Sequence, residues 1–136
     1  MSAKNYLSWQ FNHLRFCLNK LENYYQFTNG WHCGDGEAYP ESTLSKVKEL
    51  LIQTVESGFV KFDLYPGSEG SIQLHIYLEE WVIEITVYVG ILNSIYVEDP
   101  MGSTHLIEDL SDYKKALETS TQLIATIENF RNNQED

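Results

Sequence analysis

Residues 71–98 read SIQLHIYLEEWVIEITVYVGILNSIYVE, and this stretch decides the fold. Apolar side chains occupy alternate positions through most of it, as where Ile72, Leu74 and Ile76 are separated by Gln73 and His75. A period of two residues is typical of strands that place one face on a core. Because only short turns separate the runs, the pattern predicts an antiparallel meander. The predicted strands cover residues 60–64, 72–78, 81–89 and 94–98.

Helical spacing lies on both sides of this meander. Apolar residues recur at intervals of four and three over residues 5–27, and a second such stripe runs from Pro40 to Ser57. A third helix begins after a cap at Ser111 or Asp109. The order predicts an α+β fold, in which a four-stranded antiparallel meander carries three helices packed mainly on one face. We expect one domain over residues 1–131 and a frayed acidic tail over residues 132–136.

The composition excludes several classes of function. The chain has 136 residues and a formal net charge of −11, and 43% of its residues are hydrophobic. The hydrophobic content argues against intrinsic disorder, and the negative charge argues against direct binding of nucleic acid or of an anionic membrane. The start of the chain lacks the pattern of a secretory signal, no apolar run is long enough to span a bilayer, and only Cys17 and Cys33 occur. These absences favour a cytoplasmic location.

The charge is unevenly distributed along the sequence. Ten of the 20 acids lie between Lys61 and Lys114, and that interval contains no Lys or Arg. Unpaired carboxylates repel one another, but they also speed the association of a basic partner. The distribution therefore favours binding of a basic protein, and the alternative is that the acids serve solubility alone.

The alternation also predicts which side chains face away from the core. Several tyrosines and glutamates fall on that outer sheet face, where aromatic rings supply contact area and carboxylates supply steering. A cover for this face, such as the first helix, is the alternative. The predicted partner-binding residues are Tyr77, Glu79, Glu80, Glu84, Tyr88, Tyr96, Glu98 and Asp99.

Motifs for catalysis or metal binding are weak. His32 and Cys33 lie beside Asp35 and Glu37, but the four His and two Cys of the chain do not have the spacing of a zinc site. We therefore expect no catalytic residue, no metal and no cofactor, and we do not expect an enzyme. The glycine-rich stretch before the second helix predicts a structural loop, formed by Gly30, Trp31, Gly34, Gly36 and Pro40.

Residues 30–98 contain Gly30-Trp31-x-x-Gly34-x-Gly36, then Pro40 at the start of a helix, then Pro66-Gly67-x-x-Gly70-Ser71-Ile72. This order resembles a group of small, mostly uncharacterised bacterial and phage proteins, which carry a Trp-Asp-Gly-Tyr-Gly-type loop, a helix and a meander. His32-Cys33 replaces the usual acidic residue of that loop, with one extra residue. The resemblance implies an α+β fold and a bacterial or phage setting, and it supplies no catalytic residues.

A small, strongly acidic domain of this kind is similar in character to inhibitors used in microbial conflict, namely anti-CRISPR proteins, immunity proteins and antitoxins. On this hypothesis the protein neutralises a basic nuclease or another nucleic-acid-binding protein by occupying its phosphate-binding surface. One alternative is a small-ligand or enzymatic domain that uses the loop from Trp31 to Tyr39. Another is an accessory subunit that self-associates through the tyrosine face or the first helix, so both a monomer and a homodimer stay open.

Overall fold

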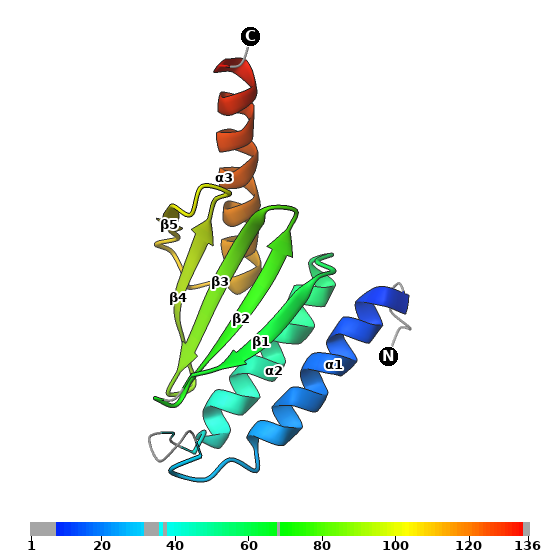
Figure 1. Ribbon diagram of the computed structural model, residues 1–136, viewed down its shortest axis with the longest axis vertical. Helices are drawn as coiled ribbons and strands as arrows, with labels where there is room; N and C mark the ends of the chain where they lie inside the picture. Colours follow the sequence, from blue (N-terminus) through cyan, green and yellow to red (C-terminus); the bar gives the residue numbers. More distant parts are fainter. Residues whose placement is uncertain (1–7, 32–35, 37, 68, 135–136) are drawn as a thin grey trace.

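Three helices pack with a five-stranded antiparallel sheet of order β1-β2-β3-β4-β5, as Figure 1 shows. The computed structural model describes residues 8–31, 36, 38–67 and 69–134. The predicted α+β class and the meander are confirmed. In chain order the elements are α1 (Ser8–Tyr24), α2 (Glu41–Glu56), β1 (Phe62–Pro66), β2 (Ser71–Leu78), β3 (Trp81–Tyr88), β4 (Ile91–Glu98), β5 (Thr104–Leu106) and α3 (Tyr113–Gln134).

The prediction of four strands was wrong, because β5 adds a fifth. This strand has three residues and pairs with Tyr96–Glu98 at one end of β4. A run of three residues is too short to show a period of two. The turn before it places the strand, since Asp99 Oδ1 accepts hydrogen bonds from the backbone N–H groups of Met101 (2.9 Å) and Ser103 (3.0 Å).

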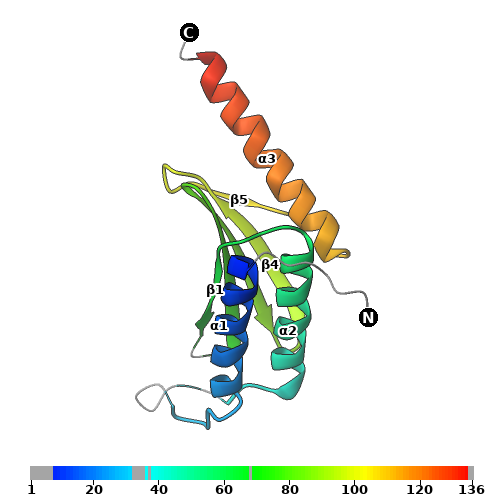
Figure 2. The same ribbon diagram turned by 90° about the vertical axis from the view of Figure 1, so that its right-hand side faces the viewer.

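The C-terminal helix is also longer than predicted. Helix α3 continues to Gln134, so residues 132–134 are helical where a frayed tail was expected, and residues 135–136 lie outside the described residues. The second half of α3 extends past the ends of the strands in Figures 1 and 2. Across the described residues, no helix combines the length and the hydropathy needed to cross a membrane.

The core lies between the sheet and the helices, with α2 and α3 on one side of the sheet and α1 adding Leu14, Cys17, Leu21 and Tyr24 beside β1. Figure 2 shows the sheet from its edge, with α2 and α3 on the same side of it. Burying each large aliphatic side chain of this layer contributes about 1.5–3 kcal/mol to the free energy of folding, so the inner face dominates stability. The sheet contributes Phe62, Leu64, Ile72, Leu74, Ile76, Trp81, Ile83, Ile85, Val87, Ile95 and Val97, and α2 contributes Leu44, Val47, Leu50, Leu51 and Val55.

Helix α1 lies along the free edge of β1. Cys17 Sγ donates to the carbonyl oxygen of Phe62 (3.7 Å), and Lys20 Nζ donates to that of Leu64 (3.2 Å). These contacts occupy backbone acceptors that an uncovered edge strand would offer to another chain. Burial raises the pKa of the Cys17 thiol to about 12, so this thiol stays protonated and has a structural role.

The turn between β3 and β4 holds two residues with positive φ, namely Val89 (φ 52°) and Gly90 (φ 71°). Two such residues in a two-residue hairpin form the type I′ turn, for which Asn-Gly is preferred. The backbone N–H of Gly90 donates to Thr43 Oγ1 of α2 (2.9 Å), and a Cβ on Gly90 would lie 2.8 Å from Ser42 Cβ. Glycine is required at position 90, whereas the β-branched Val89 is strained.

We therefore expect Val89→Asn to raise the free energy of unfolding by about 1 kcal/mol, measured by urea denaturation, because asparagine tolerates the left-handed region. Val89 is 55% exposed, so the substitution removes little packing. The opposite substitution, Gly90→Ala, should destabilise by more than about 1 kcal/mol. A loss of stability in Val89→Asn would show that this turn is not strained.

Candidate binding surface on the open sheet face

The sheet face opposite α2 and α3 is covered by no element of the described part of the chain (Figure 2). Helix α1 lies beside the β1 edge, so the alternative in which the first helix covers this face is not what the structure shows. We call this surface the open face. The strand register assigns to it Asp63, Tyr65, Ser71, Gln73, His75, Tyr77, Val82, Glu84, Thr86, Tyr88, Ile91, Ser94, Tyr96, Glu98, Thr104 and Leu106.

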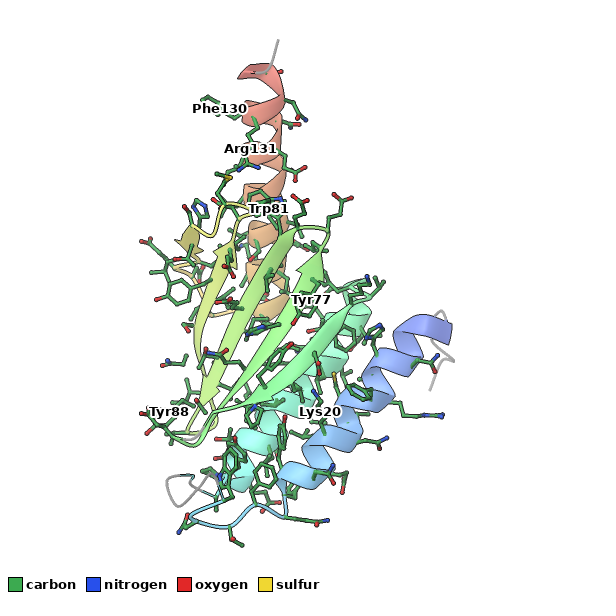
Figure 3. The ribbon with its side chains drawn as sticks, in the orientation of Figure 1. Lys20, Tyr77, Trp81, Tyr88, Phe130 and Arg131 are labelled. Carbon is green, nitrogen blue, oxygen red and sulfur yellow. The ribbon has the colours of Figure 1, made fainter. Side chains whose placement is uncertain are left out.

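Five of the eight predicted partner-binding residues share this face, and three lie around it. Figure 3 shows Tyr77 near the middle of the sheet and Tyr88 at the end near the β3–β4 turn. The three residues at the rim differ in solvent exposure. Glu79 and Glu80 are exposed in the β2–β3 turn, whereas the Asp99 side chain is only 11% exposed. The five residues on the face are Tyr77, Glu84, Tyr88, Tyr96 and Glu98.

Asp99 has a structural task at the rim. Besides the two turn amides, its carboxylate faces His105, with 3.2 Å between Asp99 Oδ2 and His105 Nε2. Partial burial opposes ionisation, but the hydrogen bonds from His105 and the turn amides outweigh it and lower the pKa of Asp99. The Asp99 side chain therefore stabilises the turn between β4 and β5.

A hydrogen-bonded aromatic group occupies the β1–β2 side of the open face. The hydroxyl groups of Tyr65 and Tyr77 lie 2.6 Å apart. His75, which pairs with Asp63 across β1 and β2, lies beside them, with its ring 4.5 Å from the Tyr65 ring. Burial lowers the pKa of His75 against the opposing effect of Asp63 and Glu98, so this imidazole is uncharged at pH 7. Burial and the bond to Tyr65 raise the pKa of Tyr77, which keeps its hydroxyl protonated.

Two residues of this region were missed from the sequence. Tyr65 continues the outward positions of β1, so the alternation of Phe62, Asp63 and Leu64 could have found it. Lys20 could not be found, because only the packing of α1 brings it to the sheet (Figure 3), where Lys20 Nζ lies 2.7 Å from Asp63 Oδ1 and 5.6 Å from the centre of the Tyr65 ring. Lys20 compensates the charge of Asp63.

The two remaining acids of the open face, Glu84 and Glu98, contact each other. They are diagonal neighbours, because Glu84 pairs with Tyr96 and Glu98 pairs with Val82 across β3 and β4. Burial, a hydrogen bond to Glu98 and the charge of Glu98 raise the pKa of Glu84, in that order of size. Across the described residues, the ion pairs of the protein go to other acids, namely Asp63, Glu49, Asp99 and Glu56.

This pair makes stability depend on pH. A carboxyl group whose pKa is raised in the folded state reduces stability as the pH rises from the ordinary glutamate value through the raised value. We expect Glu84→Gln to stabilise the free protein by about 0.5 kcal/mol at pH 7, which is typical of like charges across strands. Because protonated Glu84 resembles glutamine, the gain should fade below the pKa of Glu84. Thermal unfolding of both proteins between pH 4 and pH 8 measures it, and a gain that does not change with pH would contradict the charge explanation.

The glycine-rich loop is a second place where function was sought. Its described part is a ring cluster, in which Trp31 lies 4.5 Å from Phe27 and 5.9 Å from Tyr39, and Tyr39 donates to the Gly67 carbonyl oxygen (2.9 Å). Gly30 has φ 88° and Gly36 is buried, whereas Pro40 is the N-cap of α2. His32, Cys33, Gly34, Asp35 and Glu37 lie outside the described residues.

The described part of this loop therefore anchors α2 to β1 and β2. No group of three His, Cys, Asp or Glu side chains suited to a metal ion occurs among the residues that the structure describes.

Comparison of the chain with protein-family models, with curated proteins and with solved structures gives no match. The resemblance of residues 30–98 to small bacterial and phage proteins therefore stays a prediction. The functional proposal rests on the geometry and the charge of the open face.

Proposed function

We propose that this protein binds a basic protein partner through the open face. The observation that carries the proposal is the pair Glu84–Glu98, two acidic residues that the register of β3 and β4 makes diagonal neighbours on an uncovered sheet, with no ion pair to a basic residue among the described residues. Such a pair reduces the stability of the free protein, and a guanidinium or ammonium group from a partner would relieve that cost.

The flanking side chains fit the same task. Tyr88 is 46% exposed and Tyr96 is 38% exposed, so both present ring area while staying on rigid strands. Aromatic residues of this kind supply most of the energy of many interfaces. The strands from β1 to β5 contain no Lys or Arg, and Lys20 of α1 pairs with Asp63 alone, so Glu84 and Glu98 leave the face with a net negative charge that steers a basic partner toward it.

The partner class that we infer is a nucleic-acid-handling protein. Surfaces that hold phosphate are clusters of Lys and Arg, and an acidic face can occupy such a cluster in place of the nucleic acid. The protein would then act as an inhibitor, in the manner of anti-CRISPR proteins, immunity proteins or antitoxins. A cation beside Glu84 would lower its raised pKa, so partner binding should release a proton when it is measured at a pH below that raised pKa.

The test is affinity capture from a lysate of the source cell at low salt, with elution by a salt gradient and identification by mass spectrometry. Three baits are compared, namely the natural protein, the double variant Glu84→Gln with Glu98→Gln, and the double variant Glu22→Gln with Glu118→Gln. Both variants remove two negative charges, but the second removes them from α1 and α3.

We expect a basic, nucleic-acid-binding protein to be retained by the natural bait and by the helix variant, and its yield to fall at least tenfold on the face variant. Equal capture by all three baits would contradict the role of the open face. Elution that does not depend on salt would contradict the electrostatic mechanism.

A further inference from the structure

One half of the outer edge of β4 has no strand beside it. Among the described residues, strand β5 pairs only with Tyr96–Glu98 of β4. Directly after β5, the backbone N–H of Ile107 donates to the Ile95 carbonyl oxygen (2.9 Å). In the described part of the chain, residues 91–94 make no backbone hydrogen bond on this side. The chain after Ile107 leaves the edge and passes behind the sheet to α3 (Figure 1).

The hairpin register shows which backbone groups face this edge. Tyr88 and Ile91 close the two-residue turn, so their N–H and C=O groups bond to each other across the hairpin. In the next pair, Val87 and Leu92, the backbone groups do not bond to each other. The N–H and C=O groups of Leu92 therefore point away from β3. Leu92 therefore offers a donor and an acceptor along the open edge.

The residues of this edge lack the features that usually block strand addition. The segment Ile91-Leu92-Asn93-Ser94-Ile95 contains no charge and no proline, and Ile91 is 64% exposed. The register shift between Thr86 and Val87 is a feature that hinders the addition of another strand, because it limits the straight part of the β4 edge to a few residues. An added strand must be short.

A groove of about 540 Å³ runs beside the same edge. Its walls are the β3–β4 turn, one side of α2 and the start of α3, represented by Leu92, Gln53 and Tyr113.

We propose that a short extended peptide segment of a partner protein lies in this groove and adds to β4 in line with β5. Its backbone bonds to Leu92, and an apolar side chain covers Ile91. Only an extended backbone offers donors and acceptors in the alternation that a strand edge requires. The groove and the open face are different surfaces of the protein, and Ile91, which pairs with Tyr88, lies at the border between them.

Charge decides the kind of peptide. Lys46 lies 3.6 Å from Glu49 in the wall of the groove, and Asp112, which accepts a hydrogen bond from the backbone N–H of Lys115 (3.3 Å), is the second acid there, so the wall has a net negative charge. A peptide that carries Lys or Arg beside its apolar residue therefore fits. A second copy of this chain fits less well, because pairing two copies edge to edge would bring together two molecules of net charge −11.

The experiment selects binders from a phage-displayed library of random linear 12-residue peptides on the full chain. The selected peptides are synthesised and their affinities are measured for the natural protein, Ile91→Lys and the control Leu106→Lys. Leu106 is 54% exposed and lies on β5 outside the groove, so its variant matches Ile91→Lys in chemistry and exposure. Hydrogen exchange of the Leu92 amide is followed by NMR with and without peptide.

We expect the selected peptides to bind Ile91→Lys at least tenfold more weakly than the natural protein, and to bind Leu106→Lys as tightly as the natural protein. Bound peptide should slow exchange at Leu92. N-methylation of every second peptide amide should abolish binding when it blocks the amides that face β4, and should leave binding unchanged when it blocks the others. Ile91→Lys should not lower the thermal stability of the free chain, because Ile91 is 64% exposed, so a loss of binding is not a loss of fold.

Four results would overturn the proposal. They are a selection that enriches no peptide, equal affinities for Ile91→Lys and Leu106→Lys, unchanged exchange at Leu92 in the complex, and a peptide-free dimer in which Leu92 is already protected. The last result would assign the edge to a second copy of the chain.

Discussion

Glu84→Lys should weaken binding of the basic partner about 100-fold and, at the same time, stabilise the free protein. The loss of binding, about 2.7 kcal/mol, follows from placing a cation at the centre of the surface that receives the partner's cations. The gain in stability, up to about 1 kcal/mol, follows because the substitution replaces a like-charged diagonal pair across β3 and β4 by an ammonium group beside Glu98. Titration calorimetry and urea denaturation measure the two effects.

The matched control is Glu118→Lys on α3. It changes the net charge by the same amount, but its side chain is exposed on a helix that lies on the other side of the sheet. We expect it to weaken binding less than about threefold, which is the effect of a screened, distant charge. Equal losses in the two variants would show that net charge, rather than the open face, governs binding.

Trp81→Ala should produce the largest loss of stability, about 3–5 kcal/mol, measured by chemical denaturation. Trp81 is 1% exposed, and its Nε1–H donates to Glu128 Oε1 on α3 (2.6 Å). Figure 3 shows Trp81 at the end of the sheet beside this helix. The substitution opens a cavity in the core and also releases the contact that holds the second half of α3.

Two companion variants separate these causes. Trp81→Phe removes the hydrogen bond and keeps most of the ring, whereas Glu128→Gln keeps an acceptor oxygen. We expect Glu128→Gln to cost less than about 1 kcal/mol and Trp81→Phe an intermediate amount. If Trp81→Ala cost no more than Glu128→Gln, packing at the end of the sheet would not be a major source of stability.

The local pattern of the sequence was enough to predict most of the sheet. The alternation over residues 71–98 placed Trp81 and Ile83 on the core and Tyr77 and Glu84 on the other face, as the structure has them. It could not reveal β5, because three residues carry no period and the pairing depends on the Asp99 turn. The extent of α3 was also missed, since the polar residues after Arg131 resemble a tail although they continue the helix.

The candidate surface could be predicted only in part. Strand parity brings Glu84 and Glu98 to one face, but their contact is diagonal and depends on the register of β3 against β4. The position of α1 at the β1 edge depends on tertiary packing, so the sequence left open whether the face was covered. Lys20 shows the same limit, because its ion pair with Asp63 joins residues 43 positions apart.

The most direct test of the proposed function is hydroxyl-radical footprinting of the tyrosines in the complex with the captured partner, read by mass spectrometry. Tyr88 and Tyr25 are equally exposed, at 46% each, and Tyr25 follows α1 away from the open face, so it serves as an internal control. We expect the partner to protect Tyr88 and Tyr96 from oxidation and to leave Tyr25 unchanged. Protection of Tyr25 with continued oxidation of Tyr88 and Tyr96 would contradict the proposed function.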